Sequence, residues 1–205
     1  MRILFVRHGS TPALEASVHQ KPEEPLSEAG IRQAKRVAER LKSANADLII
    51  SSRCKRAAQT AQTISKATGR RVIYTKLLNE VASPSEFHGK KHDTESASAW
   101  NEICAHAADP KWHYSDEENL FEERSRAINA LKYLKFQKAD TLIVVTHSNI
   151  MHMMLFVGIF GEDADVIGLF PVFNDNLRTH NASITECELD RDHFRLITFN
   201  DHSHL

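Results

Sequence analysis

The most informative stretch of this sequence of 205 residues is Ile3-Leu4-Phe5-Val6-Arg7-His8-Gly9, close to its start. Its short apolar run is typical of a buried β-strand. Arg7 and His8 follow at the carboxyl end of that strand, where open α/β sheets bind their ligands. Because the planar fork of an arginine matches the geometry of a phosphate group, the stretch favours a site for an anionic substrate.

Two further strand-like runs end in polar residues in the same way. Asp47-Leu48-Ile49-Ile50 leads into Ser51-Ser52-Arg53-Cys54-Lys55-Arg56, and Thr141-Leu142-Ile143-Val144-Val145 leads into Thr146-His147-Ser148. Leu77-Leu78-Asn79-Glu80 lies between them. The sequence therefore presents arginine-histidine, arginine, glutamate and histidine in that order, mostly at the ends of predicted strands.

Helical periodicity separates the strands. Apolar residues between 31 and 41 fit one face of a helix that Ser27 caps. Residues 54–64 fit a second helix, and Gly69 is suited to end it. A strand is expected over 71–75, followed by a long helix over 120–134.

The later part of the sequence completes the predicted fold. The acidic residues Asp116-Glu117-Glu118 are expected to open the long helix, because they complement its dipole. Two strands are predicted over 183–189 and 194–199, joined by a turn at Asp190-Arg191-Asp192. The alternation of strands and helices predicts a three-layer α/β/α sandwich with a mostly parallel central sheet, in one domain that spans residues 1–205.

The segment 81–114 interrupts this alternation. It contains Pro84, Gly89 and Pro110, with a candidate helix over 96–107. We interpret the segment as an inserted lid beside the active site that contributes to substrate specificity.

Composition excludes several classes of function. Hydrophobic residues make up 41% and charged residues 26% of the sequence, and the net charge is −1, so no overall field attracts nucleic acid or an anionic membrane. The apolar stretch 150–160 contains His152 and is too short to span a bilayer, so we expect a core helix and no membrane partner. Three widely spaced cysteines favour neither a disulfide framework nor a zinc site. A cytoplasmic location is therefore expected, and the oligomeric state is open, with a dimer as one option.

Together these motifs resemble the histidine phosphatase superfamily, also called the phosphoglycerate-mutase-like family. Pro25-Leu26-Ser27-Glu28-Ala29-Gly30-Ile31-Arg32-Gln33-Ala34 is similar to that family's Pro-Leu-Thr/Ser-x-x-Gly-x-x-Gln-Ala segment, and 200–205 is similar to the tail of its smaller phosphatases. The resemblance covers the whole sequence. It implies a phosphatase of the small branch that uses neither a metal nor a cofactor.

The resemblance implies a role for each residue of the first motif. His8 would attack phosphorus as a neutral imidazole and form a phosphohistidine, with a backbone carbonyl, such as that of Gly9, holding the opposite ring N–H. Arg7 and Arg56 would bind the phosphoryl oxygens and stabilise the charge of the transition state.

The remaining catalytic roles fall to residues farther along the sequence. His147 would donate to the phosphate from the other side as an imidazolium, which a nearby dianion favours. Ser148 would add a hydrogen bond to the phosphate or cap the helix that follows. Glu80 would protonate the leaving group and then activate water, and Glu86 is a rival for this role.

Departures from the family pattern concern the substrate. Leu14 stands where many relatives carry an asparagine, and Thr11 is one residue that could supply the missing polar contact. Arg53 adds a cation near the expected mouth of the site. His88 begins a basic cluster, which is either a solvated surface or a lip that meets a second anionic group of the substrate. Thr11, Arg53 and His88 are therefore the candidate lip residues.

The favoured function is hydrolysis of a small phosphorylated metabolite. Three alternatives remain open, namely a phosphoglycerate mutase, a protein phosphohistidine phosphatase and a phosphate-binding module without catalysis. An ordered cover over 81–114 would favour a small substrate, whereas an open site would favour a protein substrate. A Glu80 displaced from the site would favour the binding module.

Overall fold

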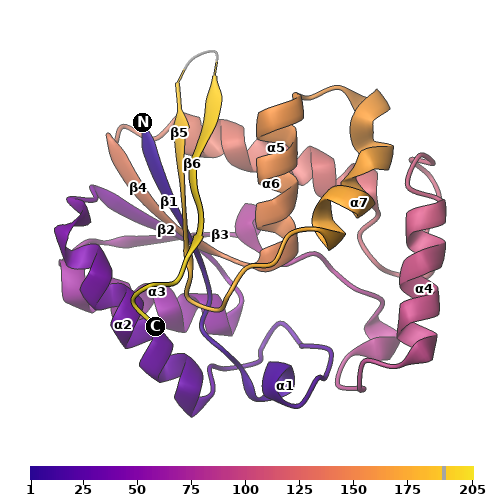
Figure 1. The fold of residues 1–205 in the computed structure, drawn as a ribbon, viewed down its shortest axis with the longest axis horizontal. Helices are drawn as coiled ribbons and strands as arrows, with labels where there is room; N and C mark the ends of the chain where they lie inside the picture. Colours follow the sequence, from indigo (N-terminus) through magenta and orange to yellow (C-terminus); the bar gives the residue numbers. More distant parts are fainter. Residues whose placement is uncertain (191–192) are drawn as a thin grey trace.

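A six-stranded sheet runs through the middle of the molecule (Figure 1). The computed structural model describes residues 1–190 and 193–205, so the predicted turn at Arg191 and Asp192 lies outside the described residues. The strands are β1 (Arg2–Arg7), β2 (Leu48–Ser52), β3 (Val72–Thr75), β4 (Thr141–Thr146), β5 (Ile184–Leu189) and β6 (Phe194–Asp201).

The order of the strands in the sheet is β3-β2-β4-β1-β5-β6. The pairs β3-β2, β2-β4 and β4-β1 are parallel, whereas β5 and β6 add antiparallel pairs at the other edge. Arg7 at the end of β1 pairs with Thr146 at the end of β4. The residues that follow, His8 and His147, therefore leave the same edge of the sheet side by side.

Helices cover both faces of the sheet, which confirms the predicted three-layer architecture (Figure 1). On one face, α2 and α3 pack against apolar side chains such as Leu4 and Ile143. On the other face, α5 and α6 pack against side chains such as Phe5 and Val144. The α-helices are α1 (Pro12–Glu15), α2 (Glu28–Leu41), α3 (Lys55–Thr68), α4 (Thr94–Ala105), α5 (Leu120–Lys135), α6 (Ser148–Phe160) and α7 (Phe170–Asp175). The short 3-10 helices are η1 (Lys42–Ala44), η2 (Lys76–Leu78), η3 (Ser85–Phe87) and η4 (Ala164–Leu169).

Several helix ends lie where the sequence predicts them. The Ser27 hydroxyl accepts a hydrogen bond from the Gly30 amide at 3.0 Å and so caps α2. Gly69 ends α3 with a φ of +71°, a conformation that glycine adopts without strain. The predicted core helix is α6, which is buried from Ile150 to Val157. Among the described residues, no helix is long and apolar enough to cross a membrane.

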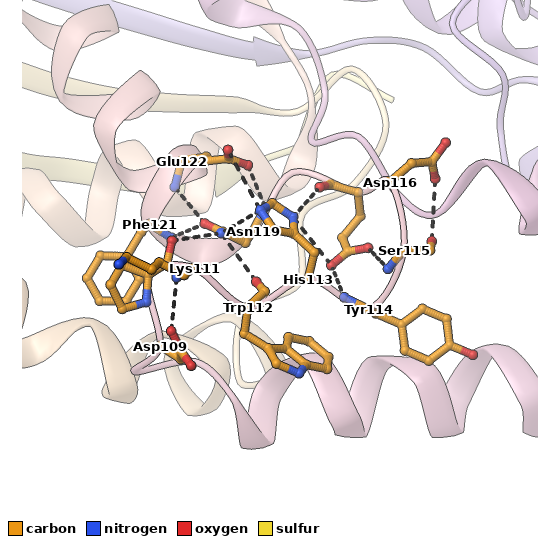
Figure 2. Close-up of polar contacts among 12 residues, drawn as sticks. Asp109, Lys111, Trp112, His113, Tyr114, Ser115, Asp116, Asn119, Phe121 and Glu122 are labelled. Carbon is orange, nitrogen blue, oxygen red and sulfur yellow. Dashed lines mark hydrogen bonds and ion pairs between the residues drawn. The ribbon is translucent and has the colours of Figure 1, made fainter.

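The long helix begins at Leu120, after the acidic run 116–118 as predicted, but its cap was not predicted. Asn119 caps α5, and its side-chain oxygen accepts from the amides of Phe121 and Glu122 (Figure 2). Glu117 lies before the helix, where its carboxylate accepts from two loop amides at 2.7 Å each. Glu118 forms an ion pair with Arg126. Glu117 and Glu118 therefore bind loop amides and an arginine, whereas Asn119 accepts the hydrogen bonds of the first amides of the helix.

The segment 81–114 contains η3 and α4, and α4 stands at the margin of the molecule, away from the sheet (Figure 1). The loop that returns from α4 to α5 is held together by Asn119, whose side-chain nitrogen donates to the carbonyls of Pro110 and Trp112 (Figure 2). The Trp112 ring in turn stacks on His106, with ring centroids 4.1 Å apart. The segment is therefore anchored at the start of α5.

Candidate active site

His8 is buried at the carboxyl end of β1 with one ring nitrogen held by the backbone. Its Nδ1 lies 2.7 Å from the Gly9 carbonyl oxygen, as predicted. A carbonyl only accepts hydrogen bonds, so this contact places the ring proton on Nδ1 and leaves a lone pair on Nε2. Burial, reinforced by Arg56 and Arg7, holds the pKa of His8 well below its ordinary value. The His8 ring is therefore a neutral base whose Nε2 is unprotonated.

Two arginines stand around this nitrogen. Arg56, in the first turn of α3, is 3% exposed, and its Nε donates to His8 Nε2 at 3.2 Å. Arg7 comes from the end of β1 and donates from Nη1 to the Thr179 carbonyl, while its Nε is buried without a partner. Burial lowers the pKa of both guanidinium groups, but arginine keeps its charge in proteins. The site thus concentrates positive charge at His8.

His147 lies beside His8, with ring centroids 4.9 Å apart. Its Nε2 contacts the Ser52 hydroxyl at 2.8 Å, and its Nδ1 is buried without a partner. Burial, followed by the charge of Arg56, lowers the pKa of His147 well below its ordinary value. In the free protein His147 is therefore a neutral imidazole, and the predicted imidazolium requires the added charge of a bound anion.

Glu80 reaches the N-terminal end of α6. Its Oε1 accepts from the amides of Val81 and Ile150, at 3.1 and 3.2 Å. Glu86, the rival acid, lies exposed in η3.

A cleft of about 480 Å³ opens above these side chains. It brings together most of the predicted site residues, and the segments 14–22 and 81–92 supply much of the remaining wall. The predicted residues that line it are Arg7, His8, Arg56, Glu80, Ser148 and His88. The fully buried His147 lies next to His8.

The structure does not bring Thr11 and Arg53 to this cleft. Thr11 is fully buried and caps α1, where its hydroxyl accepts from the Leu14 amide and the Gln20 side chain. Arg53 is exposed and is absent from the cleft wall. Ser148 does not cap α6, because its hydroxyl pairs with the hydroxyl of Thr179 at 2.8 Å.

Comparison with known proteins places this constellation in a family. The model of the histidine phosphatase superfamily (branch 1) matches residues 3–202. The chain belongs to the histidine phosphatase superfamily. It is 26% identical over 214 residues to the protein named "Putative phosphoserine phosphatase 2" of Hydrogenobacter thermophilus, with 99% of this chain and 97% of that protein covered.

Two solved structures share the fold of this chain. A mycobacterial glucosyl-3-phosphoglycerate phosphatase in complex with VO3 superposes with a TM-score of 0.81 at 24% identity, covering 97% of this chain and 98% of that chain. A phosphoserine phosphatase from Entamoeba histolytica in complex with phosphoserine gives a TM-score of 0.79 at 22% identity, covering 100% and 98% of the two chains.

This histidine phosphatase also relies on residues that the sequence analysis missed. The Ser52 hydroxyl accepts from His147 and donates to Asn79 Oδ1 at 3.1 Å, which fixes the orientation of the His147 ring. The signal was present in the sequence, because Ser52 ends a strand-like run and Asn79 directly precedes Glu80. Within 1–190 and 193–205, no three histidine, cysteine or acidic side chains gather into a metal site.

A contact between two glycines fixes the loop that carries His8. A Cβ on Gly9 would lie 2.5 Å from the Gly30 carbonyl oxygen, so only glycine fits. The Ser10 amide of the same loop donates to the Gln33 side chain at 2.8 Å. The glycine and glutamine of the segment 25–34 therefore hold the loop that carries His8 against the first turns of α2.

Proposed function

We propose that this protein hydrolyses a phosphate monoester through a phosphohistidine formed on His8. The observation that carries the proposal is the Nδ1 contact of His8 with the Gly9 carbonyl, because it leaves Nε2 as a neutral nucleophile between two guanidinium groups. A phosphate group that enters the cleft takes over the hydrogen bond that Arg56 now gives to His8. Arg7 and Arg56 then bind the phosphoryl oxygens as charge shifts in the transition state.

The reaction has two steps. In the first, the lone pair of His8 Nε2 attacks phosphorus while the ester P–O bond breaks, and the leaving oxygen takes a proton from Glu80. In the second, water attacks phosphorus and gives a proton to Glu80, and the P–N bond breaks to return the lone pair to His8. His147, protonated when the dianion binds, donates from its unpartnered Nδ1 to a phosphoryl oxygen.

A small phosphorylated metabolite suits this site better than a protein substrate. The cleft is covered on one side by residues of the segment 81–114, including Val81 and His88. The relatives named for phosphoserine and glucosyl-3-phosphoglycerate also support a small substrate. The presence of Glu80 in the cleft wall supports catalysis over phosphate binding alone.

The test compares hydrolysis of an aryl phosphate by the wild type and by His8→Ala in the presence of EDTA. We expect turnover by the wild type and a loss of at least about 1,000-fold in kcat for His8→Ala. His193→Ala, an exposed histidine at the start of the β6 region, serves as a matched control that keeps full activity. Activity of His8→Ala near that of the wild type would exclude His8 as the nucleophile. Alkaline quenching should also trap a phosphoenzyme in the wild type, since phosphohistidine is stable to base and labile to acid.

A further inference from the structure

A second cavity, of about 420 Å³, adjoins the cleft above His8. The two share wall residues, among them Val81, Ser83 and Asn149. The second cavity extends from these residues between α4 and the start of α5. A phosphate held at His8 therefore has its ester oxygen next to a space large enough for a small organic group.

Most of the exposed surface of this cavity is apolar, although polar side chains also line it. Trp100 and Ile103 contribute from α4, Leu120 contributes from the first turn of α5, and Pro84 closes the wall near the cleft. Such walls suit a hydrocarbon or aromatic group, since ligand pockets combine apolar surface with a few placed polar atoms.

Two side chains in the wall carry a buried polar atom without a hydrogen-bond partner, namely His19 at Nε2 and Glu123 at Oε1, and Glu123 is the one that lies between α4 and the start of α5. Glu123 is 2% exposed and lines the cavity, and its Oε1 makes no hydrogen bond. Burial, ahead of repulsion from Glu118, raises the pKa of Glu123 well above its ordinary value, which favours the protonated acid. Buried polar atoms are nearly always hydrogen-bonded, so an orphan in a cavity wall indicates a missing partner.

Three of the other acids of this wall already have partners, and the fourth, Asp175, is exposed. The Glu117 carboxylate accepts from the amides of Tyr114 and Ser115. Glu118 pairs with Arg126, and Asp93 caps α4 by accepting from the Ser96 amide at 2.9 Å. In the described part of the chain, no lysine or arginine lines the cavity. The negative charge of the wall therefore disfavours a second anionic group on the substrate.

We propose that this cavity holds the alcohol part of the phosphate ester, and that Glu123 binds an O–H or N–H group at the far end of that alcohol. The inference rests on the proposed phosphatase function and narrows its substrate class. The preferred substrate is a phosphate monoester with an apolar body that ends in a hydroxyl or an amine. Esters that end in a carboxylate are poor substrates, which favours the solvated surface over the lip for a second anion as the interpretation of the basic cluster at His88.

A series of alkyl phosphates of equal length tests this assignment. Its members end in a methyl, a hydroxyl, an amine or a carboxylate, and kcat/KM is measured for each. For the wild type we expect kcat/KM about tenfold higher with the hydroxyl or amine than with the methyl, since a buried partner left unsatisfied by the methyl is penalised. The carboxylate should give the lowest value.

Two variants assign the preference to Glu123. In Glu123→Leu the hydroxyl-to-methyl ratio of kcat/KM should fall to about one, because leucine fills the site without a polar atom. Glu123→Gln, which keeps a donor and an acceptor, should retain most of the ratio. Glu102→Leu removes an exposed carboxylate on α4 that lies outside the cavity wall and should leave all values unchanged.

The outcomes separate this inference from the proposed function. An unchanged ratio in folded Glu123→Leu overturns the assignment of Glu123, as does a wild type that hydrolyses all four esters equally well. In either case the phosphatase function stands. A wild type that hydrolyses neither the series nor an aryl phosphate overturns both proposals.

Discussion

Gly30→Ala tests whether the first turn of α2 holds the His8 loop in place. An added Cβ at this position would lie 2.0 Å from the Ser10 carbonyl oxygen, 2.8 Å from its nitrogen and 2.9 Å from its carbonyl carbon. Real Cβ atoms essentially never approach other atoms closer than 3.0 Å, so the two segments must separate by at least about 1 Å, the difference between 3.0 and 2.0 Å. All three contacts are with backbone atoms, which a side-chain rotation does not relieve.

The separation should reduce both stability and activity. Overpacking of this kind lowers the free energy of unfolding by about 3 kcal/mol. For a domain of this size, that corresponds to a melting temperature roughly 6–12 °C lower. Ser10 is two residues from His8, and a shift of about 1 Å in catalytic groups reduces the rate by about 100-fold. We therefore expect kcat/KM to fall by about that factor.

The assay combines thermal unfolding, followed by circular dichroism, with aryl phosphate kinetics below the melting temperature of the variant. Gly168→Ala is the matched control, because nothing lies within 4 Å of a Cβ added there and its φ is outside the left-handed region. It should leave both measurements close to wild type. A Gly30→Ala protein that loses less than about 1 kcal/mol and keeps its activity within about twofold refutes the reasoning.

Three further predictions follow from single contacts. Glu80→Gln should lower kcat on an alkyl phosphate by about 100-fold or more, whereas Glu86→Gln should change it little, as steady-state kinetics can measure. The pKa values of His8 and His147 lie below 6.5 in the folded protein, so the unfolded chain binds more protons below that pH. The free energy of unfolding, measured in urea, should therefore fall as the pH drops below about 6.5, and a flat profile would contradict this. Ser27→Ala removes the cap of α2 and a 2.6 Å hydrogen bond from its hydroxyl to Glu15; the expected loss in the same urea titration is about 1 kcal/mol.

Much of the fold was predictable because local signals and tertiary contacts agree. The short apolar runs became β1, β2 and β4, and the helix-ending residues Ser27 and Gly69 lie where propensity places them. The order of the strands was not predictable, since β4 inserts between β1 and β2 through contacts distant in sequence. The cap of α5 was missed for a different reason. Dipole arguments point to the acids before the helix, whereas Asn119 accepts the hydrogen bonds of its first amides and Glu118 pairs with Arg126.

The site was predictable where residues follow strands. Arg7, His8 and His147 were located correctly at the edge of the sheet, because parallel strands end together. Thr11 and Arg53 lie only a few residues from this edge, yet one is buried in a helix cap and the other faces solvent. Proximity in sequence therefore located the edge but did not determine which side chains turn into the cleft.

The helical periodicity of α5 in the sequence already indicates that Glu123 is buried. The buried positions of α5 are Leu120, Glu123, Ala127, Ala130 and Leu134, a helical stripe with one acid in it. A carboxyl group on such a stripe is destabilising unless a partner satisfies it, and the described protein supplies none for Oε1. The stripe ends where α5 meets the second cavity, so the acid is placed where a substrate can reach it. Glu123 thus lowers the stability of the fold and, in the proposed function, contributes to the selection of the alcohol part of the phosphate ester.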